Sequence, residues 1–75
     1  MYRYLPVKET ASSDELGTYD TWGIRVSHIT ESDSKEIRYI SDVSVNYDSV
    51  ELFTRLCNEQ QLDPIHLSDA IDDIL

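Results

Sequence analysis

The residues near the end of the sequence carry the groups best suited to chemistry. His66, Asp69 and Asp73 are spaced i, i+3 and i+7, so they would project from one side of a helix. Imidazole and carboxylate groups bind transition metals, and His28 would serve as a remote ligand. No recognised ligand spacing is present, and a solvated helix face explains the same pattern. We therefore predict no bound metal and no other cofactor.

Cys57 is the only cysteine, and together with His66 it would make a nucleophilic dyad. The predicted helix places this thiol in its last turn, where the helix dipole raises a thiol pKa, and on its apolar side. A core cysteine is the better interpretation. A single cysteine also excludes an intramolecular disulfide and the cysteine-rich zinc patterns, as expected for a reducing compartment.

Other catalytic patterns are weak. No pair of carboxylates stands out among the 15 acidic residues. The two glycines, Gly17 and Gly23, do not open a helix after a strand, as a phosphate-binding loop requires. A chain of 75 residues also leaves little room for a cleft. The sequence therefore predicts a protein that is not an enzyme.

The net charge of −9 is unevenly distributed. Residues 1–41 carry seven acidic and five basic side chains, whereas residues 42–75 carry eight acidic side chains and one basic one, Arg55. Direct nucleic-acid binding is not expected, because it requires clustered Lys and Arg. A basic protein partner fits better, although acidic surfaces also keep small proteins in solution. Asp72 and Asp73 stand at the carboxyl end of the last predicted helix, where negative charge is unfavourable. Either this end frays, or a cation from a partner or from the solvent binds there.

The length bounds the organisation of the chain. We expect one domain, residues 1–75, because a core of this size cannot be divided. The first ten residues lack the apolar run of a signal peptide, and no stretch reaches the roughly 20 apolar residues that cross a bilayer. We therefore expect a cytoplasmic protein without membrane contact. Residues 9–17, ETASSDELG, are small and polar and predict a flexible loop.

Three segments are expected to be strands. Residues 1–9 alternate least clearly, and Pro6 restricts that segment to a sheet edge or to a register in which position 6 faces away from the neighbouring strand. Residues 18–29 alternate with a period of two, and their apolar face holds Trp22, Ile24 and Val26. Residues 36–45 alternate as well, and their apolar face holds Ile37, Tyr39, Val43 and Val45. We predict an antiparallel meander whose apolar faces share one core.

After Val45 the apolar period becomes helical. One stripe of the first predicted helix holds Val50, Phe53, Leu56 and Cys57. Asp48 is the expected N-cap, and Glu51 would complete a capping box. The architecture is therefore α+β: a three-stranded antiparallel β-meander packed by two C-terminal α-helices, in the order β-β-β-α-α.

The second predicted helix has its own start signal. Asp63 is a suitable N-cap, Pro64 fits the first helical position, and Leu62 and Leu67 stand where a hydrophobic staple forms. His66 then falls at the third helical position, which favours a structural role. The apolar stripe of this helix holds Leu67, Ala70, Ile71, Ile74 and Leu75.

The tyrosines give a mild binding signal. By parity, Tyr2, Tyr4 and Tyr19 are expected on the sheet face opposite Trp22 and Leu5, near Arg25 and Arg38. Tyrosine and arginine are favoured in interfaces, although tyrosine also simply favours strands.

Several motifs resemble a domain-of-unknown-function family of short proteins from clostridia and other Gram-positive bacteria. The similarity covers most of residues 18–75 and is most specific in the closing LDPIHLSDAIDDIL. Asp72 stands where that family usually has Glu. The resemblance implies no activity. The matching positions are Tyr19, Gly23, Ile24, Asp42, Ser44, Leu56, Cys57, Asn58, Leu62, Pro64, Ile65, His66, Leu67, Asp69, Ile71, Asp73 and Leu75.

These observations favour a small acidic, non-catalytic protein-interaction or regulatory module. Two surfaces are candidates, and a homodimer is a further option because a second copy can complete a small core. The alternative is an acidic mimic of nucleic acid that inhibits a nucleic-acid-binding enzyme, as small bacterial or phage anti-restriction and anti-CRISPR proteins do. The candidate binding residues are Tyr2, Tyr4, Tyr19 and Arg38 on the sheet, and His66, Asp69, Asp72 and Asp73 at the acidic helical end.

Overall fold

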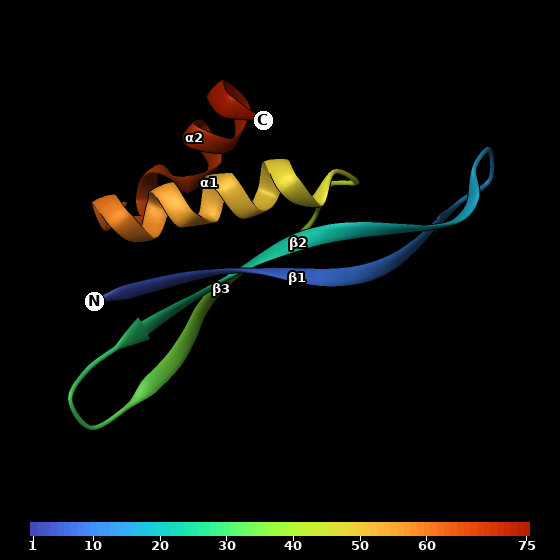
Figure 1. Cartoon of the computed structure of the whole chain (residues 1–75). Coiled ribbons are helices and arrows are strands. Elements are labelled where there is room, and N and C mark those ends of the chain that lie inside the picture. The colour runs from blue at the N-terminus through green and yellow to red at the C-terminus, as the bar shows by residue number, and fades with distance from the viewer.

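The computed structural model describes all 75 residues and has three strands followed by helices. The strands form one antiparallel sheet in the order β1-β2-β3 (Figure 1). The predicted β-β-β-α-α architecture of the α+β class is confirmed. The elements are β1 (Tyr2–Ser13), β2 (Gly17–Ile29), β3 (Ser34–Ser44), α1 (Tyr47–Gln60), the short 3-10 helix η1 (Pro64–His66) and α2 (Leu67–Ile74).

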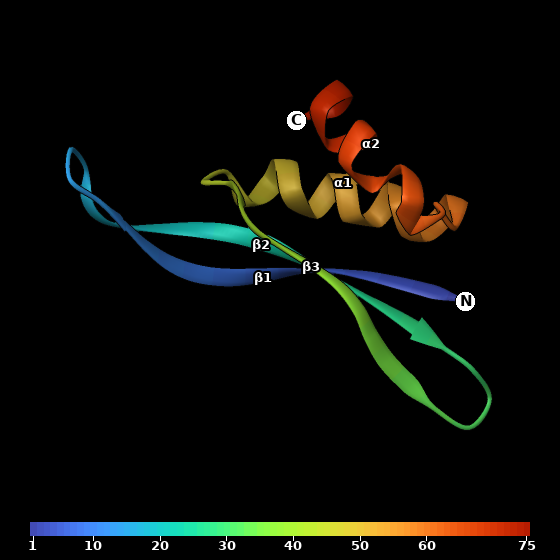
Figure 2. The same cartoon turned by 180° about the vertical axis from the view of Figure 1, so that it is seen from behind.

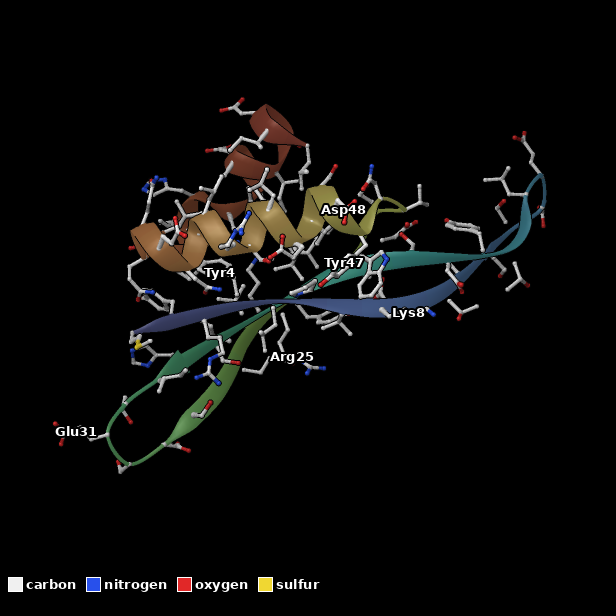
Figure 3. The ribbon with its side chains drawn as sticks, viewed as in Figure 1. Tyr4, Lys8, Arg25, Glu31, Tyr47 and Asp48 are labelled. Carbon is white, nitrogen blue, oxygen red and sulfur yellow. The ribbon has the colours of Figure 1, made fainter.

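Both α-helices lie on the same side of the sheet, and no element covers the other side (Figures 1 and 2). α1 runs along the sheet. The chain then reverses direction at η1, and α2 lies beside α1. Tyr4 of β1 points toward the helices, whereas Arg25 of β2 points away from them (Figure 3). The sheet therefore has a helix-covered face and an uncovered face.

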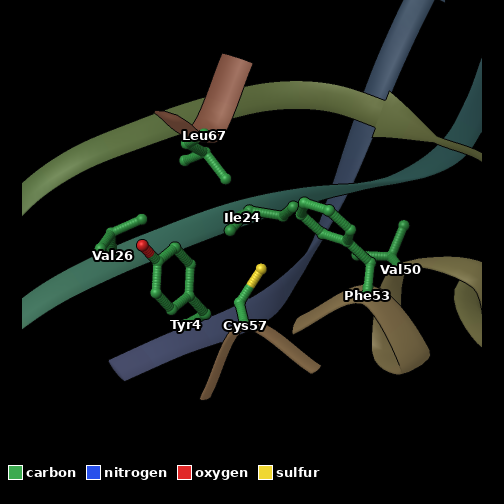
Figure 4. Close-up of a cluster of buried hydrophobic side chains, with 7 residues drawn as sticks. All are labelled: Tyr4, Ile24, Val26, Val50, Phe53, Cys57 and Leu67. Atoms are coloured by element: carbon green, nitrogen blue, oxygen red, sulfur yellow. The ribbon is translucent and has the colours of Figure 1, made fainter. Parts of the chain in front are cut away.

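The core between the sheet and the helices is small. Only 11 of the 75 residues are buried. The chain exposes 5145 Å², whereas a folded monomer of this mass exposes about 4,700 Å². The excess agrees with the two hairpin turns, which project beyond the helices in opposite directions (Figures 1 and 2). The buried cluster consists of Tyr4, Ile24, Val26, Val50, Phe53, Cys57 and Leu67 (Figure 4).

The start of β1 is held by side-chain amides at the end of α1. Asn58 accepts a hydrogen bond from the Tyr4 amide at 2.7 Å and donates one to the Tyr4 carbonyl at 2.9 Å. Gln61 makes the same pair of bonds with Tyr2, at 2.8 and 3.0 Å. The two side-chain amides thus form hydrogen bonds with the outward-facing backbone groups of Tyr2 and Tyr4, as a neighbouring strand would.

The predicted loop at residues 9–17 is wrong in extent. β1 continues to Ser13 and β2 begins at Gly17, so only residues 14–16 form the turn. Gly17 has a φ of 69°, and the Leu16 amide donates to the Ser13 hydroxyl. Polar residues are compatible with a strand here because both faces of the protruding hairpin meet water, so no buried face has to alternate.

The predicted apolar face of β3 is also wrong. Ile40 and Val43 pack against the core, whereas the side chains of Ile37 and Tyr39 are 46% and 38% exposed. Ile40 and Val43 are three residues apart, so they can lie on the same face only if the alternation of the strand is broken between them. The pairing with β2 shifts between Trp22 and Ile24, opposite Asp42, whose φ is 50°. A β-bulge therefore turns Val43 back toward the core.

The first helix begins two residues earlier than predicted. Asn46 is the N-cap, and its side chain accepts a hydrogen bond from the Ser49 amide at 3.2 Å. Asp48, the expected cap, lies in the first turn, where a negative charge is also favourable. The ring of Tyr47 packs on Trp22 with the ring centroids 4.5 Å apart.

The second helix begins as predicted, but with a tighter turn. Asp63 caps η1 by accepting from the Ile65 amide at 3.1 Å, and Pro64 occupies the first position. The α-helical part starts only at Leu67. Leu62 and Leu67 both pack into the core, in agreement with their predicted staple positions.

Candidate functional site

The predicted tyrosine-bearing sheet face is not formed. Tyr4 is fully buried on the helix-covered face, and its hydroxyl donates to the Leu62 carbonyl. Tyr2 packs against the core and against the ring of His28, with centroids 5.4 Å apart. The error lies in the parity, because Tyr4 pairs with Val26, and directly opposed residues share a face. Tyr4 cannot contact a partner.

The other two residues predicted for this face, Tyr19 and Arg38, lie on opposite faces of the sheet. Tyr19 lies on the uncovered face by alternation along β2, and its hydroxyl donates to the Asp42 carboxylate at 2.9 Å. Arg38 lies on the helix-covered side and donates to the Pro64 carbonyl at 3.1 Å and the Ser68 hydroxyl at 2.7 Å. Arg38 therefore fixes the start of α2 against β3.

Glu9 and Asp42 form a polar network with three hydroxyl groups on the uncovered face. Tyr39 donates to Glu9, and the Thr21 hydroxyl donates to Asp42 at 2.8 Å. The Glu9 carboxylate also accepts from the Asp42 amide at 2.7 Å. Hydrogen bonding to the carboxylates raises the pKa of Tyr39 and of Tyr19. These carboxylates act as structural acceptors that hold the β-bulge.

The predicted acidic helical end is exposed on η1 and α2. His66, Asp69, Asp72 and Asp73 are all exposed to water. No three His, Cys, Asp or Glu side chains in the chain converge closely enough to hold a metal ion, so the ligand set considered from the sequence is not assembled. These residues are available to a macromolecular partner.

An apolar groove lies between α1 and α2. It encloses about 130 Å³, and its lining residues, named here the helix groove, are Phe53, Leu56, Cys57, Gln60, Leu62, Ala70 and Ile74. Its opening is apolar as well, because the side chains of Leu56 and Ile74 are 38% and 62% exposed. Leu52, one turn before Leu56 on α1, is 46% exposed. The sequence placed Leu56 and Ile74 on apolar stripes, but the stripes alone do not show that the helices leave a space between them.

Acidic side chains border the helix groove. Glu59 is three residues from Leu56 on α1, and Asp73 is three residues from Ala70 on α2, so each lies beside a lining residue. From Asn46 to Leu75 the chain carries seven acidic side chains and one basic one, Arg55. Arg55 lies 3.9 Å from Glu51. The surface around the groove is therefore strongly negative.

Cys57 lines the groove as an unreactive thiol. Its side chain is buried, and burial raises its pKa to about 11. A thiol with this pKa is almost entirely protonated at neutral pH, and the thiolate is the nucleophile. The structure therefore supports the core role predicted for Cys57 over a dyad with His66.

Alkaline pH is expected to destabilise the fold in two steps. The Cys57 pKa rises from 9.0 to about 11, and burial raises the Tyr4 pKa from 10.0 to about 12. Each folded-state pKa lies above the unfolded one, so the unfolded chain releases these protons first. Stability from Cys57 is complete below pH 9 and is lost as the pH rises to 11. Stability from Tyr4 is lost between pH 10 and 12.

Urea unfolding at a series of pH values measures this dependence. A Cys57→Ala variant should lose most of the fall in unfolding free energy between pH 9 and 10, because the tyrosines, whose ordinary pKa is 10.0, contribute mainly above this interval. If the unfolding free energy of both proteins falls equally over this interval, the pH dependence does not come from the Cys57 thiol.

No helix of the chain is long and apolar enough to span a membrane. A family model matches the chain over residues 1–75, and its description is a family of unknown function (DUF6514). No curated protein and no solved structure matches the chain. The matched residues include the sheet, both helices and the groove.

Proposed function

We propose that this chain, which belongs to the DUF6514 family of unknown function, is a small non-catalytic module that binds another protein through the helix groove. The observation that carries this proposal is the apolar opening between α1 and α2. Leu56 and Ile74 expose large apolar side chains there, next to an unfilled space, and Leu52 exposes another one turn earlier on α1. Exposed apolar surface rimmed by polar residues is typical of interaction sites.

The chemistry of the remaining residues supports a binding role over a catalytic one. The thiol in the groove is protonated at neutral pH, and the carboxylates of Glu9 and Asp42 accept hydrogen bonds that hold the β-bulge. No base is positioned against a nucleophile among these groups. A groove lined mostly by aliphatic and aromatic carbon provides affinity through burial.

The acidic mimic of nucleic acid is supported less well. Such a mimic needs carboxylates in a row that reproduces the phosphate backbone. Here the exposed acids occur on both hairpin turns and on both helices, and those beside the groove border apolar side chains. Apolar side chains match a protein surface better than they match a phosphate-binding one.

A matched pair of variants tests the proposed function. Leu56→Glu places a charge in the groove, and Ile37→Glu places the same charge on β3, outside the groove lining, at a similar exposure. Both proteins and the wild type are used as baits in extracts of the cells that make this protein. The proposal expects a protein that binds the wild type and Ile37→Glu but not Leu56→Glu.

The folding of each bait is checked by its melting temperature, and Leu52→Glu replaces Leu56→Glu if the latter unfolds. The proposal is overturned if no captured protein depends on the residue at position 56 or 52.

A further inference from the structure

We infer that the helix groove receives a basic amphipathic helix of its partner, with one apolar face and flanking Lys or Arg side chains. This inference rests on the proposed function and names the partner's binding element. It follows from the shape of the groove, the size of its hollow and the sign of the charge around it.

The walls of the groove are two helices. Phe53, Leu56 and Gln60 come from α1, whereas Ala70 and Ile74 come from α2. A groove of this kind takes the apolar face of a third helix, whose side chains at i, i+3, i+4 and i+7 enter it. The hollow of about 130 Å³ has room for one large apolar side chain, since a cavity of about 150 Å³ holds a benzene molecule.

The charge around the groove selects a basic helix. Segment 46–75 has a net charge of −6, because it contains seven acidic side chains and one arginine. Glu59 and Asp73 flank the apolar opening, and Asp48 lies one turn before Leu52. A helix with Lys or Arg beside its apolar face places cations against these carboxylates.

The helix dipoles act in the same direction. Gln60 and Ile74 are the last residues of α1 and α2, and both line the groove. The carboxyl end of a helix carries a partial negative charge, and neither last turn contains a basic residue. Cationic side chains in this groove therefore meet two negative helix ends in addition to the carboxylates.

Two other occupants fit less well. A second copy of this chain carries the same net charge of −9 and brings acid against acid at the groove. An extended strand would add to a sheet edge, but the start of β1 is already satisfied by Asn58 and Gln61. The basic helix is the occupant that matches both the apolar and the charged part of the surface.

Three synthetic helical peptides test the inference by calorimetry with the full chain. The first has Leu on one face and Lys on the other faces. The second replaces each Lys with Glu, and the third has the composition of the first in a scrambled order without an apolar face. We expect binding of the first peptide only, weakening as salt is added.

Charge-reversal variants locate the contact. Glu59→Lys and Asp73→Lys should each lower the affinity for the basic peptide about fivefold or more, as expected when a charge at the rim of the groove is reversed. Glu31→Lys makes the same charge change in the β2–β3 turn, away from the helices (Figure 3), and should leave binding unchanged. Leu56→Glu should weaken binding about tenfold or more, as expected for a central apolar contact.

The outcomes separate this inference from the proposed function. Equal binding of the acidic amphipathic peptide overturns the basic partner and supports a groove that binds helices. Equal binding of the scrambled peptide, or an equal effect of Glu31→Lys, shows charge attraction without the groove and overturns the inference. No binding of any peptide also overturns it, while the position-56 capture experiment decides the proposed function independently.

Discussion

Replacing Gly23 with alanine is expected to lower the free energy of unfolding by about 2–3 kcal/mol. A Cβ atom at this position would lie 2.7 Å from the Ile40 carbonyl oxygen, 2.9 Å from the Tyr39 hydroxyl and 3.1 Å from the Glu9 carboxyl carbon. The tyrosine can move, but the Ile40 carbonyl belongs to the neighbouring strand. The methyl group therefore forces β2 and β3 apart beside the bulge at Asp42.

Gly17→Ala is the matched control for this substitution. Gly17 has a φ of 69°, but nothing lies within 4 Å of an added Cβ, so only backbone strain of about 1–2 kcal/mol is expected. Urea unfolding of both variants measures the difference. If Gly23→Ala costs no more than Gly17→Ala, the close approach of the strands at Gly23 is not as described.

Replacing Asn58 with alanine is expected to cost about 2–3 kcal/mol, since two partly buried backbone groups lose their partner. The Asn58 amide is the partner of both the amide and the carbonyl of Tyr4, whose side chain fills the centre of the core. The variant should also speed hydrogen exchange at the Tyr4 amide. Unfolding free energy and exchange rate are measured on the same protein.

Gln61→Ala removes the equivalent bonds to Tyr2 at an exposed position. Water can replace those bonds, so a loss of only about 0.5–1 kcal/mol is expected. Equal losses for the two variants would show that the strand edge at Tyr4 is not protected by Asn58.

The types and order of the elements could be predicted because local periodicity agrees with the final packing. Ile24 and Val26 alternate along β2 and both enter the core. Val50, Phe53 and Cys57 share one side of α1 and are likewise buried. The cap at Asp63 was also predictable, because proline follows it directly.

The register of β3 could not be predicted because it depends on a contact distant in sequence. Asp42 adopts a positive φ, which is uncommon for a residue with a side chain. Its amide is held by Glu9, which lies 33 residues earlier in the chain. Without that contact, strict alternation is the reasonable expectation, and it places Ile37 and Tyr39 on the wrong face.

The prediction of a tyrosine-bearing sheet face was wrong for a related reason. Parity within β1 does not say which face the helices will cover, and this choice depends on the pairing of Tyr4 with Val26. The helix groove was beyond prediction because it depends on how α2 leaves η1. An apolar stripe on α2 predicts contact with α1, but not an opening at Leu56 and Ile74.

The groove as a partner-binding surface is tested most directly by photo-crosslinking inside the cells that make the protein. A photoreactive amino acid replaces Leu56 in one version and Ile37 in another, so that one probe sits at the groove and the other on β3, outside the groove lining. We predict an adduct of one discrete mass from position 56 and none from position 37. No adduct from position 56, or the same adduct from both positions, would contradict the assignment of the groove.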